Sequence, residues 1–270
     1  MRIDEFERVD ASDNPGALVA HTDSVRSLDA IRDAKRWTYG RLLEADPVAR
    51  LLDVGCGTGE DLTALQAAID DGGVVGVDSS AAMLDQAVAR TEGGLLLVRA
   101  EGAALPFADG AFDGARIDRV LLHVSEPAAV VGELARVVRP GARVVALEPD
   151  FETAVIGVAG SDVDAIQQRL KPLQTERLVR NPRVGHALTA LLNDAALVDI
   201  AVRGWVSILS DYDLARDGLG LERIATEAVG TVIDEGECER WLGALHRAAD
   251  DGSFFTAMTF FAACGTKAGG

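Results

Sequence analysis

The chain has 270 residues, of which 48% are hydrophobic and 26% are charged, proportions typical of a folded globular protein rather than a disordered or collagen-like one. Its 43 acidic residues outnumber its 26 lysines and arginines, which gives a formal net charge of -17 at pH 7. A surface of that charge would repel a phosphate backbone, so the composition argues against a nucleic-acid partner.

The start of the chain and its cysteines both indicate a cytoplasmic protein. The opening residues MRIDEFERVDASDNPG carry frequent charges and lack the basic and apolar segments of a secretion signal. No apolar run approaches membrane-spanning length, so we expect no membrane partner. Cys56, Cys238 and Cys264 are odd in number and far apart, which fits neither a disulfide framework nor a metal motif, and we expect reduced thiols.

The first half of the chain has the pattern of an α/β domain. Residues 1–49 are predicted to form an N-terminal helical cap, with a helix over residues 24–43. From residue 50, short apolar runs alternate with amphipathic helical patterns: LLDVG, DLTALQAAI, VVGVD, SAAMLDQAVAR, LLLVRA, FDGARI, AAVVGELARVV and ARVVALEPD. Continuous apolar runs separated by helices indicate a doubly wound parallel sheet buried on both faces. Ligands bind such sheets at the carboxyl ends of the strands.

The second half of the chain is predicted to complete the sheet and cover it. After residue 150 the pattern indicates a helical stretch to residue 178, a helix over 185–194, a strand over 197–209 and a last strand over 254–267. The continuous apolar character of the last strand predicts a buried position in the sheet. Residues 211–251 have helical periodicity, and we expect them to form a helical lid inserted into a core of residues 50–210 and 252–270.

The loop after the first core strand is rich in glycine. Gly55, Gly57 and Gly59 form GxGxG, whereas the dinucleotide fingerprint is GxGxxG. Glycines between a strand and a helix let the main chain lie close to a ligand. The carboxylate of Asp53, just before the loop, would repel a pyrophosphate but suits an ammonium group, which argues against NAD.

The next two strand ends predict the rest of the ligand. Asp78 ends the second strand, where an acid can accept hydrogen bonds from both hydroxyls of a ribose. Glu101 and Gly102 follow the third strand, where a carboxylate and an amide can recognise adenine. Ammonium, ribose and adenine together describe S-adenosylmethionine.

At this point the sequence resembles the class I S-adenosylmethionine-dependent methyltransferases, in particular the small-molecule group related to the ubiquinone and menaquinone biosynthesis enzymes. The matching stretches are LLDVGCGTG, VVGVDSSAAMLDQA, RAEGAALPFADGAFD, RVLLHVSEPAAVVGELARVVRPGARVV and LEPDF, which span residues 50–151 almost without interruption. The resemblance implies a Rossmann-like seven-stranded sheet, mostly parallel with an antiparallel last strand, S-adenosylmethionine as cofactor and S-adenosylhomocysteine as product.

The resemblance also assigns cofactor roles to individual residues. The methionine portion would lie against Asp53 and the loop, the ribose against Asp78, and the adenine against Glu101, Gly102 and Met83. The full predicted cofactor site comprises Asp53, Gly55, Cys56, Gly57, Thr58, Gly59, Asp78, Ser79, Met83, Glu101, Gly102, Ile117, Asp118 and Arg119.

Residues after the fourth and fifth strands are candidates for the substrate side. We expect Arg119 and His123 at the start of the helix that follows the fourth strand. His123 is the candidate catalytic base, with a structural role in the helix as the alternative. Arg119 either binds a carboxylate of cofactor or substrate or forms a structural ion pair with Asp118 or Asp53. Asp150 and Phe151 would lie beside the substrate, with a core position as the alternative for Phe151.

The predicted function is therefore methyl transfer to O, C or N of a small hydrophobic or aromatic metabolite in biosynthesis. The alternative is an enzyme that retains the cofactor and catalyses a non-methyl reaction, such as a cyclisation or rearrangement. A nicotinamide-dependent oxidoreductase and a regulatory binding module are weaker alternatives. We expect no metal, and the sequence leaves a homodimer open.

Overall fold

The computed structural model describes residues 6, 9–11, 15–44, 50–69, 72–157 and 160–269. Within them lies a seven-stranded sheet with strand order β3-β2-β1-β4-β5-β7-β6. The strands are β1 Arg50–Val54, β2 Gly73–Asp78, β3 Leu96–Arg99, β4 Phe112–Asp118, β5 Val138–Gly157, β6 Leu197–Leu209 and β7 Phe255–Lys267. Strands β1 to β5 pair in parallel, whereas β7 lies antiparallel between β5 and β6. This topology confirms the predicted sheet and the buried position of its last strand.

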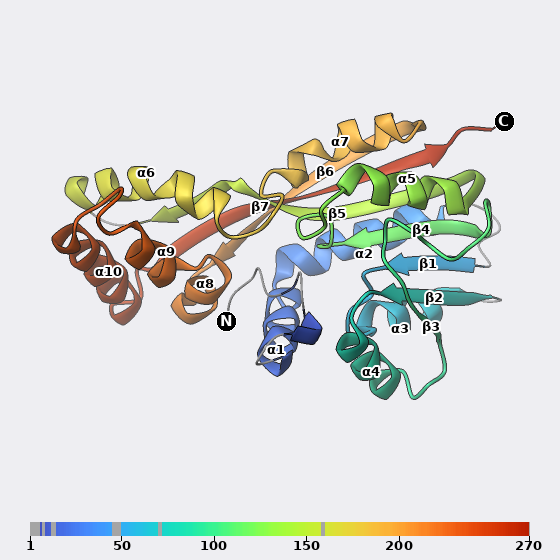
Figure 1. Cartoon of the computed structure of the whole chain (residues 1–270), viewed down its shortest axis with the longest axis horizontal. Coiled ribbons are helices and arrows are strands. Elements are labelled where there is room, and N and C mark those ends of the chain that lie inside the picture. Colours follow the sequence, from blue (N-terminus) through green and yellow to red (C-terminus); the bar gives the residue numbers. More distant parts are fainter. Residues whose placement is uncertain are drawn as a thin grey trace.

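Helices cover both faces of the sheet (Figure 1). They are α1 Pro15–Arg26, α2 Asp29–Leu43, α3 Glu60–Ala67, α4 Ala81–Arg90, α5 Pro127–Val137, α6 Ser161–Glu176, α7 Val184–Asp194, α8 Tyr212–Gly218, α9 Leu221–Ala228 and α10 Glu235–Asp250. Successive strand side chains point to opposite faces, so Leu51 packs with Leu42 and Leu62 of α2 and α3. Leu52 belongs instead to a second cluster, which includes residues of α5 and α7. The apolar run of β1 is thereby buried on both sides.

Two segments differ from the sequence prediction. The predicted helix over residues 24–43 is two helices, α1 and α2, separated at Leu28, whose backbone is extended (φ -65°, ψ 135°). Strand β5 continues beyond Asp150 to Gly157, where a helical stretch was predicted. The extension follows a register shift between Asp150 and Val155, after which Val155 to Gly157 pair with β7. Pairing with a long neighbouring strand therefore outweighs the local preference of the sequence.

The extended strands lead to a group of helices at one end of the molecule. Figure 1 shows β5, β6 and β7 reaching past the other strands toward α6, α8, α9 and α10. The last three helices lie in the segment 211–251, and α10 buries Trp241 completely. The indole Nε1 of Trp241 donates to Oε1 of Gln167 on α6 over 3.1 Å, which ties α10 to α6.

Two further findings concern the apolar character of the helices and the state of the cysteines. In the part of the chain that the structure describes, no helix is long and apolar enough to cross a membrane. Cys56, Cys238 and Cys264 are free and buried. Burial raises the pKa of all three thiols, which makes them less reactive.

Candidate active site

The glycine loop between β1 and α3 owes its glycines to two different causes. Gly55, Gly57 and Gly59 all have positive φ angles, of 71°, 51° and 77°. A Cβ atom at Gly55 would lie 2.1 Å from Cγ2 of Val120, and one at Gly59 would lie 2.9 Å from Cβ of Ala87. At Gly57 a Cβ would meet no atom within 4 Å. Gly55 and Gly59 thus permit close packing within the protein, whereas Gly57 keeps the loop surface open to a ligand.

Asp78 is held in place by this loop at the end of β2. Its carboxylate accepts hydrogen bonds from the amides of Gly57 and Ser80, each over 2.9 Å. Burial raises the pKa of Asp78, while the two amides oppose that effect. The carboxylate is therefore oriented before any ligand binds.

The N-terminal segment is joined to the protein beside Asp78. Asp10 accepts hydrogen bonds from the hydroxyl of Ser80 over 2.5 Å and from the amide of Ala82 over 3.1 Å, at the first turn of α4. Its carboxylate also pairs with Arg99 at 3.0 Å. Sequence reasoning missed Asp10, because an acid in an irregular segment gives no sign of the helix it will cap.

A network of buried charges lies beneath the carboxyl ends of β1 and β4. Arg116 is fully buried, and its guanidinium binds Asp53 at 3.0 Å, Asp118 at 2.5 Å and Asp61 at 3.1 Å. Asp53 and Asp118 were predicted in the site from the sequence, whereas Arg116 and Asp61 were not, although both line the cavity. The signal was present, since a basic residue inside the apolar strand FDGARID needs a buried acidic partner.

Helix α2 contributes the second cation of this network. Nζ of Lys35 pairs with Asp61, and lies 3.0 Å from Oδ2 of Asp118. The Tyr39 hydroxyl donates to Oδ1 of Asp61 over 2.7 Å. Burial disfavours ionisation of both acids, but Arg116 and Lys35 outweigh it and hold the pKa values of Asp61 and Asp118 well below their usual range. Helix α2 is thus joined to the site by charge as well as by apolar packing.

The turn after β4 is organised by a buried acid on β5. The amides of Val120 and Leu121 donate to Oε1 of Glu148 over 2.9 and 2.7 Å. Burial raises the pKa of Glu148 to about 8, and among the described residues its Oε2 has no hydrogen-bond partner. Arg119 opens the turn with φ of 57°, and its Nε donates to Oδ1 of Asp118 over 3.1 Å. A non-glycine residue with positive φ is strained and is retained only where the surroundings fix it.

Two residues of this turn lie in a different element from the one predicted. Arg119 and His123 were expected at the start of a helix, but they lie in the turn, and α5 begins only at Pro127. The physical reason is the pair of hydrogen bonds that two backbone amides donate to Glu148. They hold the chain in a turn before the helix begins at Pro127.

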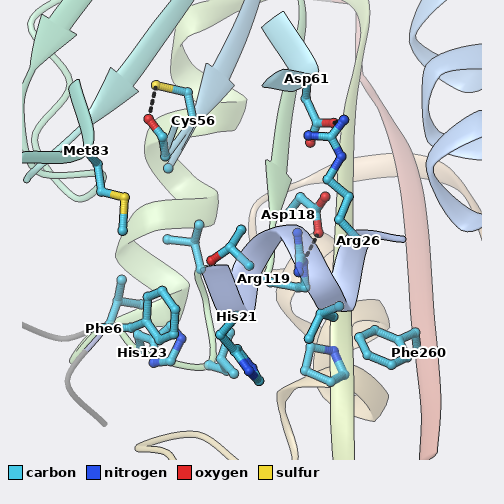
Figure 2. A pocket seen from close by; sticks show the side chains of 18 of the residues that line it. Phe6, His21, Arg26, Cys56, Asp61, Met83, Asp118, Arg119, His123 and Phe260 are labelled. Atoms are coloured by element: carbon cyan, nitrogen blue, oxygen red, sulfur yellow. Dashed lines mark hydrogen bonds and ion pairs between the residues drawn. The ribbon is translucent and has the colours of Figure 1, made fainter. Parts of the chain in front are cut away.

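Two histidines approach the site from different elements (Figure 2). The ring of His123 stacks on Phe6 with 5.4 Å between centroids, and His21 of α1 lies 6.4 Å from the same phenyl ring. Burial, together with the charge of Arg119, lowers the pKa of His21 to about 4. His21 is therefore neutral at physiological pH.

These elements enclose a cavity of about 460 Å³. Most of the predicted site residues line it, namely Asp53, Gly55, Cys56, Gly57, Thr58, Asp78, Ser79, Met83, Glu101, Gly102, Asp118, Arg119, His123 and Phe151. Apolar side chains of α8 and the extended strands also line it, among them Leu214, Leu209, Met258 and Phe260.

Three predicted residues do not line the cavity: Gly59, Ile117 and Asp150. Asp150 lies away from the cavity because neighbouring strand residues point to opposite faces. Pro149 and Phe151 face the cavity, whereas the fully buried Asp150 accepts hydrogen bonds from the backbone of His186 and Glu152, over 2.9 and 3.1 Å. Ile117 likewise packs in the core.

The helical segment 211–251 divides between the cavity and the core. Leu214 and Leu219 line the cavity. Leu221 and Trp241 are fully buried in the core, and Tyr212 donates to Glu222 over 3.0 Å. Only part of this segment therefore lines the cavity in the described structure.

Comparison with known proteins gives the family. A family model described as "Methyltransferase domain" matches residues 52–146. The demethylmenaquinone methyltransferase of Clavibacter sepedonicus is 32% identical over 176 residues, which cover 61% of this chain and 70% of that protein. The chain belongs to the class I S-adenosylmethionine-dependent methyltransferases. S-adenosylmethionine, the methyl donor of this family, is its cofactor.

Two further similarities extend beyond the family model. An uncharacterised 37.1 kDa protein in transposon Tn4556 of Streptomyces fradiae is 38% identical over 248 residues, covering 90% of this chain and 69% of that protein. The crystal structure of the YcgJ protein of Bacillus subtilis aligns with a TM-score of 0.59 and 20% identity, over 87% of this chain and 100% of that chain. The structural similarity concerns the fold alone, and it agrees with the seven-stranded sheet of this methyltransferase.

Proposed function

We propose that this methyltransferase transfers its methyl group to O, C or N of a small hydrophobic or aromatic metabolite. The observation that carries the proposal is the continuity of the cavity. One end lies at the carboxyl ends of β1, β2 and β4, among Asp53, Asp78 and Asp118, and the other lies among apolar side chains of α8, β6 and β7. A polar cofactor and an apolar acceptor would therefore meet inside a single enclosure.

The residues at the polar end fit the cofactor. Two amides hold the carboxylate of Asp78 at the wall of the cavity, and a Cβ at Gly57, beside it, would meet open space. In the wall of the same cavity, Nε of Arg116 is buried without a hydrogen-bond partner among the described residues. We assign ribose binding to Asp78, adenine binding to Glu101, Gly102 and Met83, and binding of the amino-acid portion to the loop and Asp53. S-adenosylmethionine supplies an electrophilic methyl group on a positively charged sulfur.

The chain's own residues would position the acceptor and exclude water. Helix α8 places Leu214 and Leu219 over the apolar end, and we propose that it acts as a lid. His123 remains our candidate for holding or removing a proton from the acceptor. The neutral His21 can accept or donate one hydrogen bond but is too weak a base to remove a phenolic proton.

Incubation with methyl-labelled S-adenosylmethionine and a panel of apolar acceptors tests this function. We expect label to enter an aromatic or aliphatic acceptor, with release of one S-adenosylhomocysteine per methyl group. Replacing Leu214 with Arg should abolish transfer while leaving cofactor affinity within about twofold, because the new charge would lie in the apolar end alone. Conversion of an acceptor without label uptake, sustained equally by S-adenosylhomocysteine, would instead establish the cyclisation or rearrangement alternative.

A further inference from the structure

Acidic and basic side chains are unevenly distributed along the cavity wall. The end of the cavity to which we assign the adenosine of the cofactor is lined by three acids, Asp78, Glu101 and Glu126, and by no base among the described residues. The middle combines acids with bases in the buried network around Arg116. The apolar end, formed by α8 and strands β5 to β7, is lined by no carboxylate in the described part of the chain. The cations that line the cavity are Arg26, Lys35, Arg116, Arg119 and the exposed Arg180. Arg26, Lys35 and Arg116 pair with Glu60, Asp61 and Asp53, respectively.

Arg119 lies at the boundary between the network and the apolar end. Its Nε donates a hydrogen bond to Oδ1 of Asp118. The structure records no bond from its two terminal nitrogens to any other described residue, and the side chain, 18% exposed, lines the cavity. Figure 2 shows Arg119 between Asp118 and the lower part of the cavity, where His21 and Phe260 lie. The free edge of a guanidinium presents parallel N–H groups that match the two oxygens of a carboxylate.

His21 shows that the charge of Arg119 reaches the apolar end. His21 packs against α8, since a Cβ at Gly218 would lie 3.3 Å from its Cε1, and Arg119 disfavours its protonation. Asp217 acts on His21 in the opposite direction, but it pairs with Arg216 at 3.1 Å and does not line the cavity. Arg119 is thus close enough to the His21 side of the cavity to act on a group there.

The charge of the reactants favours an anionic acceptor as well. S-adenosylmethionine has a net charge of +1 at neutral pH, with an ammonium, a sulfonium and a carboxylate. Asp118 offsets part of the charge of Arg119 from one side of the guanidinium. A negative group on the acceptor, placed against the other edge of this guanidinium, would be attracted both to Arg119 and to the positively charged cofactor.

We propose that the methyl acceptor is a monocarboxylate with an apolar body, and that Arg119 binds its carboxylate. This inference rests on the proposed function, because it concerns the acceptor of the same site. The competing role for Arg119 is to bind the carboxylate of the cofactor.

Calorimetric binding of a matched ligand pair tests the inference without requiring turnover. The probes are naphthoate and naphthamide, which share an apolar body and differ in charge, titrated into protein saturated with S-adenosylhomocysteine. The variants are Arg119→Gln and Arg119→Lys. The control is Arg183→Gln, which removes an exposed arginine that pairs with Glu152 and does not line the cavity.

We expect naphthoate to bind the parent protein and the Arg183→Gln control at least about tenfold more tightly than naphthamide. Arg119→Gln should bring the two affinities within about twofold, and Arg119→Lys should retain part of the difference, because a lysine keeps the charge but loses the paired N–H groups. Affinity for S-adenosylhomocysteine should change by less than about threefold in both variants.

Two results would overturn the inference. Equal affinity of the parent protein for the two probes would show that the site does not recognise a carboxylate. A large loss of S-adenosylhomocysteine affinity in Arg119→Gln, with the preference for naphthoate unchanged, would assign Arg119 to the cofactor. Absence of methyl transfer to any acceptor would contradict the proposed function but would leave this binding comparison valid.

Discussion

Arg116 and Asp53 are register partners on the neighbouring parallel strands β4 and β1, and their side chains form an ion pair of 3.0 Å. Both side chains are almost completely buried, with exposed fractions of 1% and 3%. The same guanidinium also binds Asp61 of α3 and Asp118 at the end of β4. A single arginine therefore joins the strand ends and the helix that follows the glycine loop into one rigid base for the cofactor site.

Removing this guanidinium should destabilise the fold strongly. Arg116→Met leaves Asp53, Asp61 and Asp118 with too little compensating charge, and we expect the free energy of unfolding to fall by about 3–5 kcal/mol. Arg36→Met is the matched control, because Arg36 is 73% exposed and pairs with Asp33 on the surface of α2. That change should cost less than about 1 kcal/mol. Urea denaturation measures both, and similar losses for the two variants would contradict the role assigned to Arg116.

Substitutions at two glycines of the loop should differ in their effects, one lowering mainly the stability of the protein and the other mainly its affinity for the cofactor. Gly55→Ala places Cβ 2.1 Å from Val120 at a φ of 71°, so we expect a loss of stability above about 2 kcal/mol. Gly57→Ala meets no protein atom within 4 Å and should cost only about 1 kcal/mol, for its positive φ. Its methyl group should nevertheless weaken S-adenosylmethionine binding by about tenfold, because it lies on the open surface of the loop. Unchanged affinity in Gly57→Ala would show that the ligand does not contact this surface.

Adding Val120→Ala to Gly55→Ala gives an internal control. The shorter side chain removes Cγ2, so the double variant should recover part of the stability that Gly55→Ala loses. No recovery would mean that backbone strain, rather than the contact with Val120, is the cause.

Glu148 should make stability depend on pH. Its pKa in the folded protein is raised to about 8 by burial, above the ordinary value of 4.5, so the folded state holds a proton that the unfolded chain releases. The corresponding stability is fully present below about pH 4.5 and is lost as the pH rises toward 8, by at most about 1.4 kcal/mol per pH unit. Glu148→Gln keeps an oxygen acceptor for Val120 and Leu121 and cannot ionise, so its stability should fall less over this range.

Denaturation at pH 5, 6.5 and 8 would measure the difference, the values being chosen to span the interval between the two pKa values. Parallel pH profiles for the parent protein and Glu148→Gln would show that Glu148 is ionised in the folded state throughout.

The fold could be predicted from the sequence, and most of the predicted cofactor residues line one cavity, because both depend on local patterns. Buried parallel strands read as continuous apolar runs, and the glycines and Asp78 stand at their carboxyl ends, so each could be placed from its neighbours in the chain. The structure puts Asp78 beside Gly57 as this logic requires.

The features that sequence reasoning missed depend on contacts between distant segments. Lys35 of helix α2 reaches Asp118 at the end of strand β4, and Asp10 reaches Ser80 across 70 positions. The position of Asp150 depends on which face of β5 it presents, and the pairing of β5 with β7 fixes that face. No periodicity within the segment itself encodes such choices.

The central claim, that S-adenosylmethionine binds across the ends of β1 and β2, is tested most directly by calorimetric titration of the cofactor into Asp78→Asn and Asp85→Asn. Asp78 is fixed by the amides of Gly57 and Ser80, whereas Asp85 is exposed on α4 and does not line the cavity. We predict that Asp78→Asn weakens binding by about tenfold or more, since a charge-assisted hydrogen bond to the ribose is lost, and that Asp85→Asn changes it by less than about twofold. Equal affinity of both variants and the parent protein would contradict the account.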